Sequence, residues 1–103
     1  MNNLDFSVII LSYNTKDITV RCLEKLKIAK EYSEKRLKNS VEVIVLDNAS
    51  SDGSAQIIKT DFPWVKLVAS KENLGFSRGN NIAMEESKNP FILLLNSDVY
   101  VEE

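Results

Sequence analysis

The stretch Pro90-Phe91-Ile92-Leu93-Leu94-Leu95, followed at once by Asn96-Ser97-Asp98, decides the fold. An apolar run without polar alternation is typical of a strand buried on both faces, as in a parallel sheet. Open parallel sheets bind ligands at the carboxyl ends of their strands. A carboxylate placed there can hold a hard divalent cation, and the cation can hold phosphate. The sequence therefore predicts a candidate metal and phosphate site directly after this strand.

Three further strands and three helices are expected before this run. The strands are expected at 6–12, 41–46 and 65–69. The first helix is expected to begin after a cap at Thr15 and to reach about residue 32 or beyond. The second is expected near 55–58, after a cap by Ser51 or Asp52. The third is expected from 76 or 77 to about 87, with Phe76, Ile82 and Ala83 facing inward. This alternation predicts an α/β fold: a Rossmann-like, three-layer α/β/α domain over residues 1–103, with a mainly parallel sheet in the strand order 3-2-1-4.

Polar residues follow three of these strands, at the point where each strand ends. They are Ser12-Tyr13-Asn14, Asp47-Asn48 and Asn96-Ser97-Asp98. Because the carboxyl ends of parallel strands meet at the same edge of a sheet, we expect these groups to converge there.

Composition excludes several classes of function. The chain has 103 residues and a net charge of −2 with acids and bases interspersed, which predicts no basic field for DNA, RNA or an anionic membrane. It has no histidine, which excludes a Ser-His-Asp site within it, and its one cysteine, Cys22, excludes an internal disulfide. No apolar run approaches the roughly 20 residues of a membrane span and no signal peptide is visible, so a cytoplasmic location is expected.

Each polar motif also has an ordinary structural explanation. Asp98 either binds a metal or merely ends a strand, and Asp47-Asn48 either binds a base or ribose or forms a turn. Arg78 is a planar donor suited to phosphate. Gly79 costs a helix about 1 kcal/mol relative to alanine, so it needs a packing or a ligand reason. Asp52 is expected to be a helix cap rather than a ligand.

The combination resembles the nucleotide-binding part of family-2 glycosyltransferases of the GT-A fold, and is most similar to the rhamnosyltransferase-like branch. Four stretches carry the resemblance, in the family's order and over nearly the whole chain: Val8 to Asn14, Val43 to Ser54, Asn73 to Asn81 and Phe91 to Asp98. The resemblance implies that residues 1–103 are the nucleotide-sugar-binding, N-terminal portion of a larger glycosyltransferase.

The resemblance also implies roles for individual residues. Ser12, Tyr13 and Asn14 would line the nucleotide pocket, and Asp47, with Asn48 beside it, would contact the base or ribose. Arg78 and Asn80 would lie beside the ribose and diphosphate. Asn96-Ser97-Asp98 occupies the place of the family's D-x-D motif, with Asp98 as ligand of Mn²⁺ or Mg²⁺ and Asn96 replacing an aspartate.

The implied reaction is inverting transfer of a sugar from a nucleoside-diphosphate donor to a hydroxyl of an acceptor saccharide or lipid-linked saccharide, in polysaccharide biosynthesis of the cell envelope. The catalytic base is expected outside residues 1–103, so no catalytic residue is assigned here. The full-length protein is expected in the cytoplasm at the inner face of the membrane. No nucleic acid partner is expected, and the open edge of the fourth strand predicts oligomerisation.

Two other classes remain open at this point. A receiver-like signalling module phosphorylated on Asp47 fits the size and alternation, but its acidic metal ligands are missing after the first strand. A dinucleotide-dependent dehydrogenase lacks the glycine-rich turn at the same place.

Overall fold

The computed structural model describes residues 5–89 and 91–96. Its elements are β1 (Phe6–Ser12), α1 (Lys16–Leu37), β2 (Val41–Asp47), α2 (Ser54–Asp61), β3 (Lys66–Ala69), α3 (Gly75–Glu85) and β4 (Phe91–Asn96). The four strands form one sheet in the order β3-β2-β1-β4. All neighbouring strands are parallel. The predicted α/β class, strand order and parallel pairing are confirmed.

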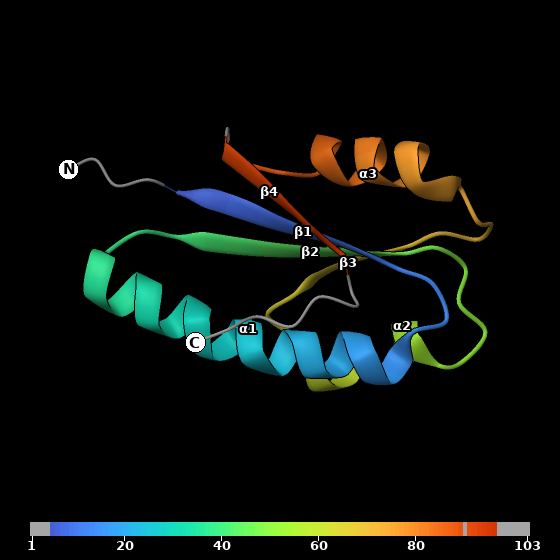
Figure 1. Cartoon of the computed structure of the whole chain (residues 1–103), viewed down its shortest axis with the longest axis horizontal. Coiled ribbons are helices and arrows are strands. Elements are labelled where there is room, and N and C mark those ends of the chain that lie inside the picture. The colour runs from blue at the N-terminus through green and yellow to red at the C-terminus, as the bar shows by residue number, and fades with distance from the viewer. Residues whose placement is uncertain (1–4, 90, 97–103) are drawn as a thin grey trace.

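The sheet is the middle of three layers. α1 and α2 cover one face and α3 covers the other (Figure 1). This arrangement follows from the right-handed crossovers. The chain moves in one direction along the sheet from β1 through β2 to β3, which places α1 and α2 on one face, and it moves in the opposite direction from β3 to β4, which places α3 on the other face. Within the described residues, no helix is both long enough and apolar enough to cross a bilayer.

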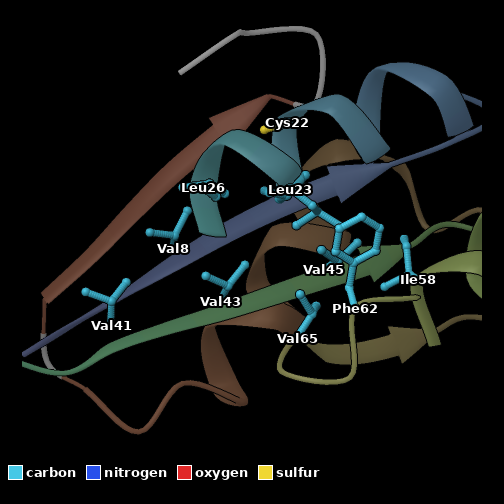
Figure 2. Packing of buried hydrophobic residues seen from close by; sticks show 11 residues of the cluster. Val8, Cys22, Leu23, Leu26, Val41, Val43, Val45, Ile58, Phe62 and Val65 are labelled. Atoms are coloured by element: carbon cyan, nitrogen blue, oxygen red, sulfur yellow. The ribbon is translucent and has the colours of Figure 1, made fainter. Parts of the chain in front are cut away.

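The larger core lies between the sheet and α1 and α2. Cys22, Leu23 and Leu26 of α1 point onto valines of β1 and β2, and Ile58 and Phe62 close the α2 side (Figure 2). Cys22 is fully buried, which raises the pKa of its thiol, and it acts as a small packing residue. A smaller cluster of Ile9, Ile44, Leu46 and Ala83 packs beneath α3.

α1 begins differently from the prediction. Thr15 is the N-cap residue, but its side chain makes no capping hydrogen bond. Instead, the carboxylate of Asp52, from the loop after β2, accepts the Lys16 N–H at 3.0 Å. Thr15 Oγ1 lies 3.0 Å from Thr19 Oγ1 and 3.3 Å from Ser12 Oγ, so it belongs to a hydroxyl cluster. A cap from a distant loop leaves no local signal in the sequence.

The end of α1 is fixed to the start of β2. Lys38 adopts a left-handed conformation and its N–H donates to the Glu34 carbonyl at 3.1 Å. The Glu34 carboxylate accepts the Val41 N–H at 2.9 Å and pairs with Lys30. Partial burial acts to raise the pKa of Glu34, but these bonds lower the pKa overall.

β4 is not buried on both faces, so that prediction is wrong for the residues described. Phe91, Ile92, Leu93 and Leu94 keep between 37% and 56% of their surface exposed. The strand pairs with β1, and within the described part of the chain nothing pairs with its outer edge. An apolar groove of about 320 Å³ separates it from α1, lined by Phe6, Val8, Leu26, Ala29, Lys30, Ser33, Val41, Leu93 and Leu95.

A polar cluster joins α3 and β4 to the amino end of the sheet. Ser7 Oγ donates to Glu42 Oε1 at 2.8 Å and accepts from Ser87 Oγ at 2.7 Å. Glu42 also accepts the Lys88 N–H at 3.1 Å, and the Asn89 amide donates to Ser7 Oγ at 3.3 Å. Because Ser7 is fully buried, these bonds satisfy a hydroxyl that water cannot reach.

Gly79 lets α3 pack closely on the sheet. Gly79, Asn80 and Ala83 are the buried residues of this helix. A Cβ at Gly79 would lie 2.7 Å from Leu11 Cδ1 and 3.5 Å from both Leu46 Cδ2 and Asn48 Nδ2. The glycine therefore has the packing reason that the sequence required. Phe76 was expected inward on the same face, but it lies in the first turn of α3 with 62% of its surface exposed.

Gly79→Val is expected to lower the free energy of unfolding by about 1–3 kcal/mol, because the branched side chain overpacks the contact with Leu11. Asn81→Val is the control, since Asn81 is exposed on the same helix and receives the same side chain. Urea denaturation of both variants measures the difference. Equal losses in the two would mean that the close approach contributes nothing.

Candidate functional site

The carboxyl ends of β1 and β2 form the rim predicted from the sequence. Ser12 is paired in register with Asp47, and Leu11 is paired with Asn96 on the other side of β1. The ends of three strands therefore lie next to one another. Asn96 is placed as the last residue of β4, whereas Ser97 and Asp98 lie outside the described residues.

Asp47 closes the turn that follows β2. Its Oδ1 accepts the Ser50 hydroxyl at 2.6 Å and its Oδ2 accepts the Ser50 N–H at 3.0 Å. The side chain is 2% exposed, so it is a carboxylate buried among hydrogen-bond donors. An ionised carboxylate has about four acceptor positions. These two bonds fix its orientation at the end of β2.

The loops after β1 and β2 are bound to each other through Asn14. The Asn14 N–H donates to Ser50 Oγ at 2.8 Å, and Asn14 Oδ1 accepts the Ser51 N–H at 2.8 Å. Asn14 has a φ of 52°, a left-handed conformation that asparagine tolerates. Ala49 has a φ of 66°, which strains a residue with a Cβ. The Asp47 turn and the Asn14 loop therefore form one hydrogen-bonded unit.

Ser12 and Tyr13 are neighbours with opposite environments. Ser12 is fully buried, its hydroxyl lies 3.0 Å from Thr19 Oγ1, and its carbonyl accepts the Asn48 N–H at 2.8 Å. Tyr13 is 49% exposed. Ser12 thus holds the two loops in place, while Tyr13 offers an aromatic surface beside them.

Asp52 connects the same unit to both helices on its face of the sheet. Its Oδ2 accepts the Lys16 N–H at the start of α1, and its Oδ1 accepts the Ser54 N–H at the start of α2, each at 3.0 Å. The Ser54 hydroxyl also donates to Oδ1. Partial burial acts to raise the pKa of Asp52, but the bonds from Ser54 and Lys16 lower the pKa overall. Asp52 thus accepts the first N–H of both helices, as expected of a cap, although the N-cap position of α2 itself is Gly53.

A hollow of about 410 Å³ opens beside Asp52. It is lined by Asn14, Thr15, Lys16, Asp17, Ile18 and Asp52. It lies on the α1 side of the Asn14 loop, so a ligand held there would contact this loop from the side of the helix.

Asn48 joins the rim to α3. Its Oδ1 accepts the Leu74 N–H at 2.7 Å and its Nδ2 donates to the Gly75 carbonyl at 3.3 Å. The residue is 3% exposed, so its amide serves the loop before α3. Gly75 has a φ of 80°, which a residue with a Cβ rarely adopts. These contacts set where α3 begins relative to β2.

α3 carries the two remaining residues expected at the site. Arg78 is exposed, and Asn80 is 6% exposed. The structure therefore brings Ser12, Asn14, Asp47 and Asn48 into one hydrogen-bonded unit. Asn80 lies on the buried face of α3 and Arg78 on the exposed face of the same helix. Which of them touch a ligand stays a prediction.

Sequence reasoning missed Ser50 and Thr19. Ser50 joins Asp47 to Asn14, and Thr19 accompanies Ser12 beneath the rim. A signal existed for Ser50, because a serine three residues after an aspartate is typical of a turn closed by the carboxylate.

The described residues do not supply a metal site by themselves. No group of three or more histidine, cysteine, aspartate or glutamate side chains is gathered anywhere in residues 5–89 and 91–96. Asp47 is the one carboxylate on the rim among them, and Ser50 binds both of its oxygens. The metal site predicted at Asp98 stays a prediction, because Asp98 lies outside the described residues.

A parallel sheet in this order, with aspartate and asparagine on its carboxyl rim, defines a Rossmann-like α/β protein of the kind that binds ligands at strand ends. Residues 7–103 match the family described as Glycosyl transferase family 2. The chain belongs to this family, which confirms the resemblance and favours it over a receiver-like module or a dehydrogenase.

Relatives and solved structures agree with this assignment. The uncharacterized glycosyltransferase YfnE of Bacillus subtilis is 31% identical over 96 residues, which cover 90% of this chain and 23% of YfnE. Poly(ribitol-phosphate) beta-N-acetylglucosaminyltransferase TarS of Staphylococcus aureus is 28% identical over 103 residues, covering 97% of this chain and 17% of TarS. The chain thus spans less than a quarter of either relative.

Two solved structures share the fold. S. aureus TarS in complex with UDP has a TM-score of 0.77 at 25% identity, over 96% of this chain and 29% of that one. A mannosyltransferase from Pyrobaculum calidifontis, in complex with GDP-Man and Mn²⁺, has a TM-score of 0.82 at 20% identity, over 100% of this chain and 30% of that one. The predicted GT-A fold is confirmed.

Proposed function

We propose that this chain is the donor-binding portion of a glycosyltransferase and that it binds a nucleoside-diphosphate sugar at the rim of the sheet. One observation carries the proposal: Asn14 after β1 and the pair Asp47-Asn48 at the end of β2 are far apart in the sequence but belong to one hydrogen-bonded unit at the carboxyl ends of these strands. Family membership and the complex of TarS with UDP support the choice of ligand.

The site residues have distinct roles in this proposal. Asp47 accepts hydrogen bonds from the base or ribose, and Tyr13, Asn14 and Asn48 line the nucleotide pocket with Ser12 beneath them. Arg78 and Asn80 lie beside the ribose and diphosphate. Asn96 contacts the sugar or ribose hydroxyls, and Asp98 holds Mn²⁺ or Mg²⁺. The Mn²⁺ in the mannosyltransferase complex supports a divalent ion as cofactor.

The reaction proposed for the longer protein is inverting transfer. The acceptor oxygen forms a bond to the anomeric carbon as the bond to the diphosphate oxygen breaks, and a carboxylate base outside residues 1–103 takes the acceptor proton. A divalent ion held by Asp98 would supply positive charge beside the leaving diphosphate. This chain supplies donor binding and orientation.

The acceptor is proposed to be a saccharide or lipid-linked saccharide of the cell envelope. A relative named teichoic acid poly(glycerol phosphate) polymerase, and TarS with its poly(ribitol-phosphate) acceptor, support this class. The proposed location is the cytoplasm, at the inner face of the membrane. No nucleic acid partner is proposed, and the exposed edge of β4 is the proposed surface for oligomerisation.

A thermal-shift panel tests the binding proposal. UDP, dTDP and GDP are added to the purified chain with and without Mn²⁺, and one of them is expected to raise the melting temperature only when Mn²⁺ is present, because bound ligand stabilises the folded state. Asp98→Ala is expected to remove the shift. Asp61→Ala, which removes an exposed carboxylate from the end of α2, is expected to retain it.

The outcomes separate the parts of the proposal. Stabilisation that persists in Asp98→Ala would reject the metal ligand but keep the nucleotide site. The absence of any shift, together with labelling of Asp47 by acetyl phosphate, would favour the receiver-like module. Sugar transfer by residues 1–103 alone would overturn the assignment of the base to another part of the protein.

A further inference from the structure

The charges of this chain are unevenly distributed. Residues 16–38, which are α1 and its C-cap, contain eight of the thirteen lysines and arginines but only four of the fifteen acids. This segment therefore carries a net charge of +4, although the whole chain carries −2. The prediction of no basic field for a membrane was based on the charge of the whole chain, and this helix departs from that average.

Several of these cations share one face of α1 with apolar side chains. Steps of three and four residues place them along a single line of the helix, which we call the basic stripe. Its members are Arg21, Lys25, Ile28, Tyr32, Lys35 and Arg36. The stripe runs from Arg21 to Arg36, which is 15 steps along the helix and therefore about 22 Å at 1.5 Å per residue.

The basic stripe faces away from the core. Ile28 is 55% exposed and Tyr32 is 62% exposed, whereas Cys22 and Leu23 on the opposite side of α1 are fully buried. Lys25 is half-buried, and Arg21, Lys35 and Arg36 are exposed. Figure 1 shows α1 in the outer layer on its side of the sheet, together with α2. No acid lies on this line between Arg21 and Arg36, but Asp17 precedes Arg21 on it by one turn, and Glu24 and Glu31 border it.

The cations of the stripe are available to an outside partner. Among the described residues, ion pairs join Lys30 to Glu34 and Lys66 to Glu86, and none involves the stripe. The guanidinium of Arg36 lies 5.6 Å from the centroid of the Tyr32 ring, which holds a charge beside an exposed aromatic surface.

We propose that the basic stripe docks this chain on a membrane surface that contains anionic phospholipid. Two features together favour lipid: four unpaired cations attract the headgroups, and Ile28 and Tyr32 between them can enter the boundary with the acyl chains. A straight, convex helix face also fits a plane better than a groove. A nucleic acid would use the charges but would leave the aliphatic side chain of Ile28 without a partner.

This proposal does not depend on the nucleotide site, because the stripe shares no residue with the rim. It gives the proposed location at the inner face of the membrane a specific surface. α1 would lie flat on the bilayer, and the sheet would stand on the other side of the helix.

Vesicle co-sedimentation tests the proposal on the purified chain. Vesicles of phosphatidylcholine with phosphatidylserine are expected to bind it, and vesicles of phosphatidylcholine alone are not. Each cation near an anionic leaflet contributes about 1 kcal/mol, or about fivefold in partitioning. Lys35→Gln with Arg36→Gln is therefore expected to weaken binding about 25-fold.

A matched variant controls for net charge. Lys59→Gln with Lys71→Gln removes two exposed cations from α2 and the loop before α3, and it is expected to bind the anionic vesicles like the unchanged chain. Ile28→Ser with Tyr32→Ser tests the apolar part, and it is expected to weaken binding while keeping the charge. Thermal melting of every variant confirms that each remains folded.

Four results would overturn the proposal. The first is no binding to anionic vesicles, and the second is equal binding to neutral vesicles, as expected if the apolar β4 edge were responsible. The third is an equal loss of binding in the Lys35→Gln with Arg36→Gln variant and in the Lys59→Gln with Lys71→Gln variant. The fourth is stripe-dependent binding of a DNA duplex that is at least as strong as binding of vesicles. The nucleotide thermal shift of the stripe variants reports on the rim separately, so either proposal can fail alone.

Discussion

Asp52→Ala is expected to lower the free energy of unfolding by about 1–4 kcal/mol, because one carboxylate caps the N-termini of two helices and each cap contributes about 0.5–2 kcal/mol. The variant loses the bonds from the Lys16 N–H and from the Ser54 N–H and hydroxyl. It also removes a negative charge from the positive ends of both helix dipoles. Urea denaturation measures the loss as a lower midpoint with an unchanged slope.

Asp52→Asn separates charge from hydrogen bonding. The pKa of Asp52 is lowered in the folded chain, so its carboxylate contributes stability above its unfolded pKa of about 3.9, and this contribution is lost as the pH falls through the folded value. The asparagine variant is expected to be less stable at neutral pH but to lose less stability than the unchanged chain on acidification. Glu34, whose pKa is also lowered, keeps its own acid-dependent loss in both proteins.

Asp61→Asn is the control for net charge, because Asp61 is an exposed carboxylate at the other end of α2. An Asp52→Ala variant as stable as Asp61→Asn would show that the two capping interactions have little value in solution. Parallel acid profiles for Asp52→Asn and the unchanged chain would contradict the assignment of part of the pH dependence to this residue.

Asn48→Ala is expected to cost about 2–4 kcal/mol, because it leaves the Leu74 N–H without its acceptor and the Gly75 carbonyl without its donor. The side chain is nearly fully buried, so water cannot readily replace it. The loop before α3 then loses its link to the end of β2. We expect the nucleotide-dependent thermal shift to fall as well, since α3 carries Arg78 and Asn80.

Asn48→Asp and Asn81→Ala are the two comparisons. The aspartate keeps an acceptor for Leu74 but sets a carboxylate oxygen against the Gly75 carbonyl, so it is expected to be destabilising although nearly isosteric. Asn81 is exposed on α3, and its change to alanine is expected to have no cost because alanine favours helix. A nucleotide shift that is retained in a folded Asn48→Ala chain would separate the α3 link from binding.

The sequence predicted the strand order because local patterns and topology rules agree in this chain. Apolar runs, polar breaks and helical spacing alternate, and right-handed crossovers then leave few arrangements. The environment of β4 could not be predicted in the same way. The run from Phe91 to Leu95 shows what surroundings the strand requires, but not whether the described residues supply them. Phe76 shows a similar limit, because periodicity gives the side of a helix and not how far the sheet extends beneath it.

The sequence predicted where the candidate site lies on the sheet, but not the hydrogen bonds that build it. The topology brought Ser12 and Asp47 to one rim, as the register confirms. The bonds among the loops were not predictable, since a bond such as that between Asn14 and Ser51 depends on two left-handed residues, Asn14 and Ala49. The same holds for Asp52, whose cap for α2 is local in the sequence while its cap for α1 spans 36 residues.

The Ser7 cluster at the amino end of the sheet shares no residue with the loops that form the rim. It secures the start of β4 against β1 from the far end of the strands. The Ser7 cluster and the loops of the rim can therefore change independently. Exchange of the loops after β1 and β2 for those of another family member is expected to leave the anchorage of β4 intact, so the proposed nucleotide site can be altered without loosening this strand.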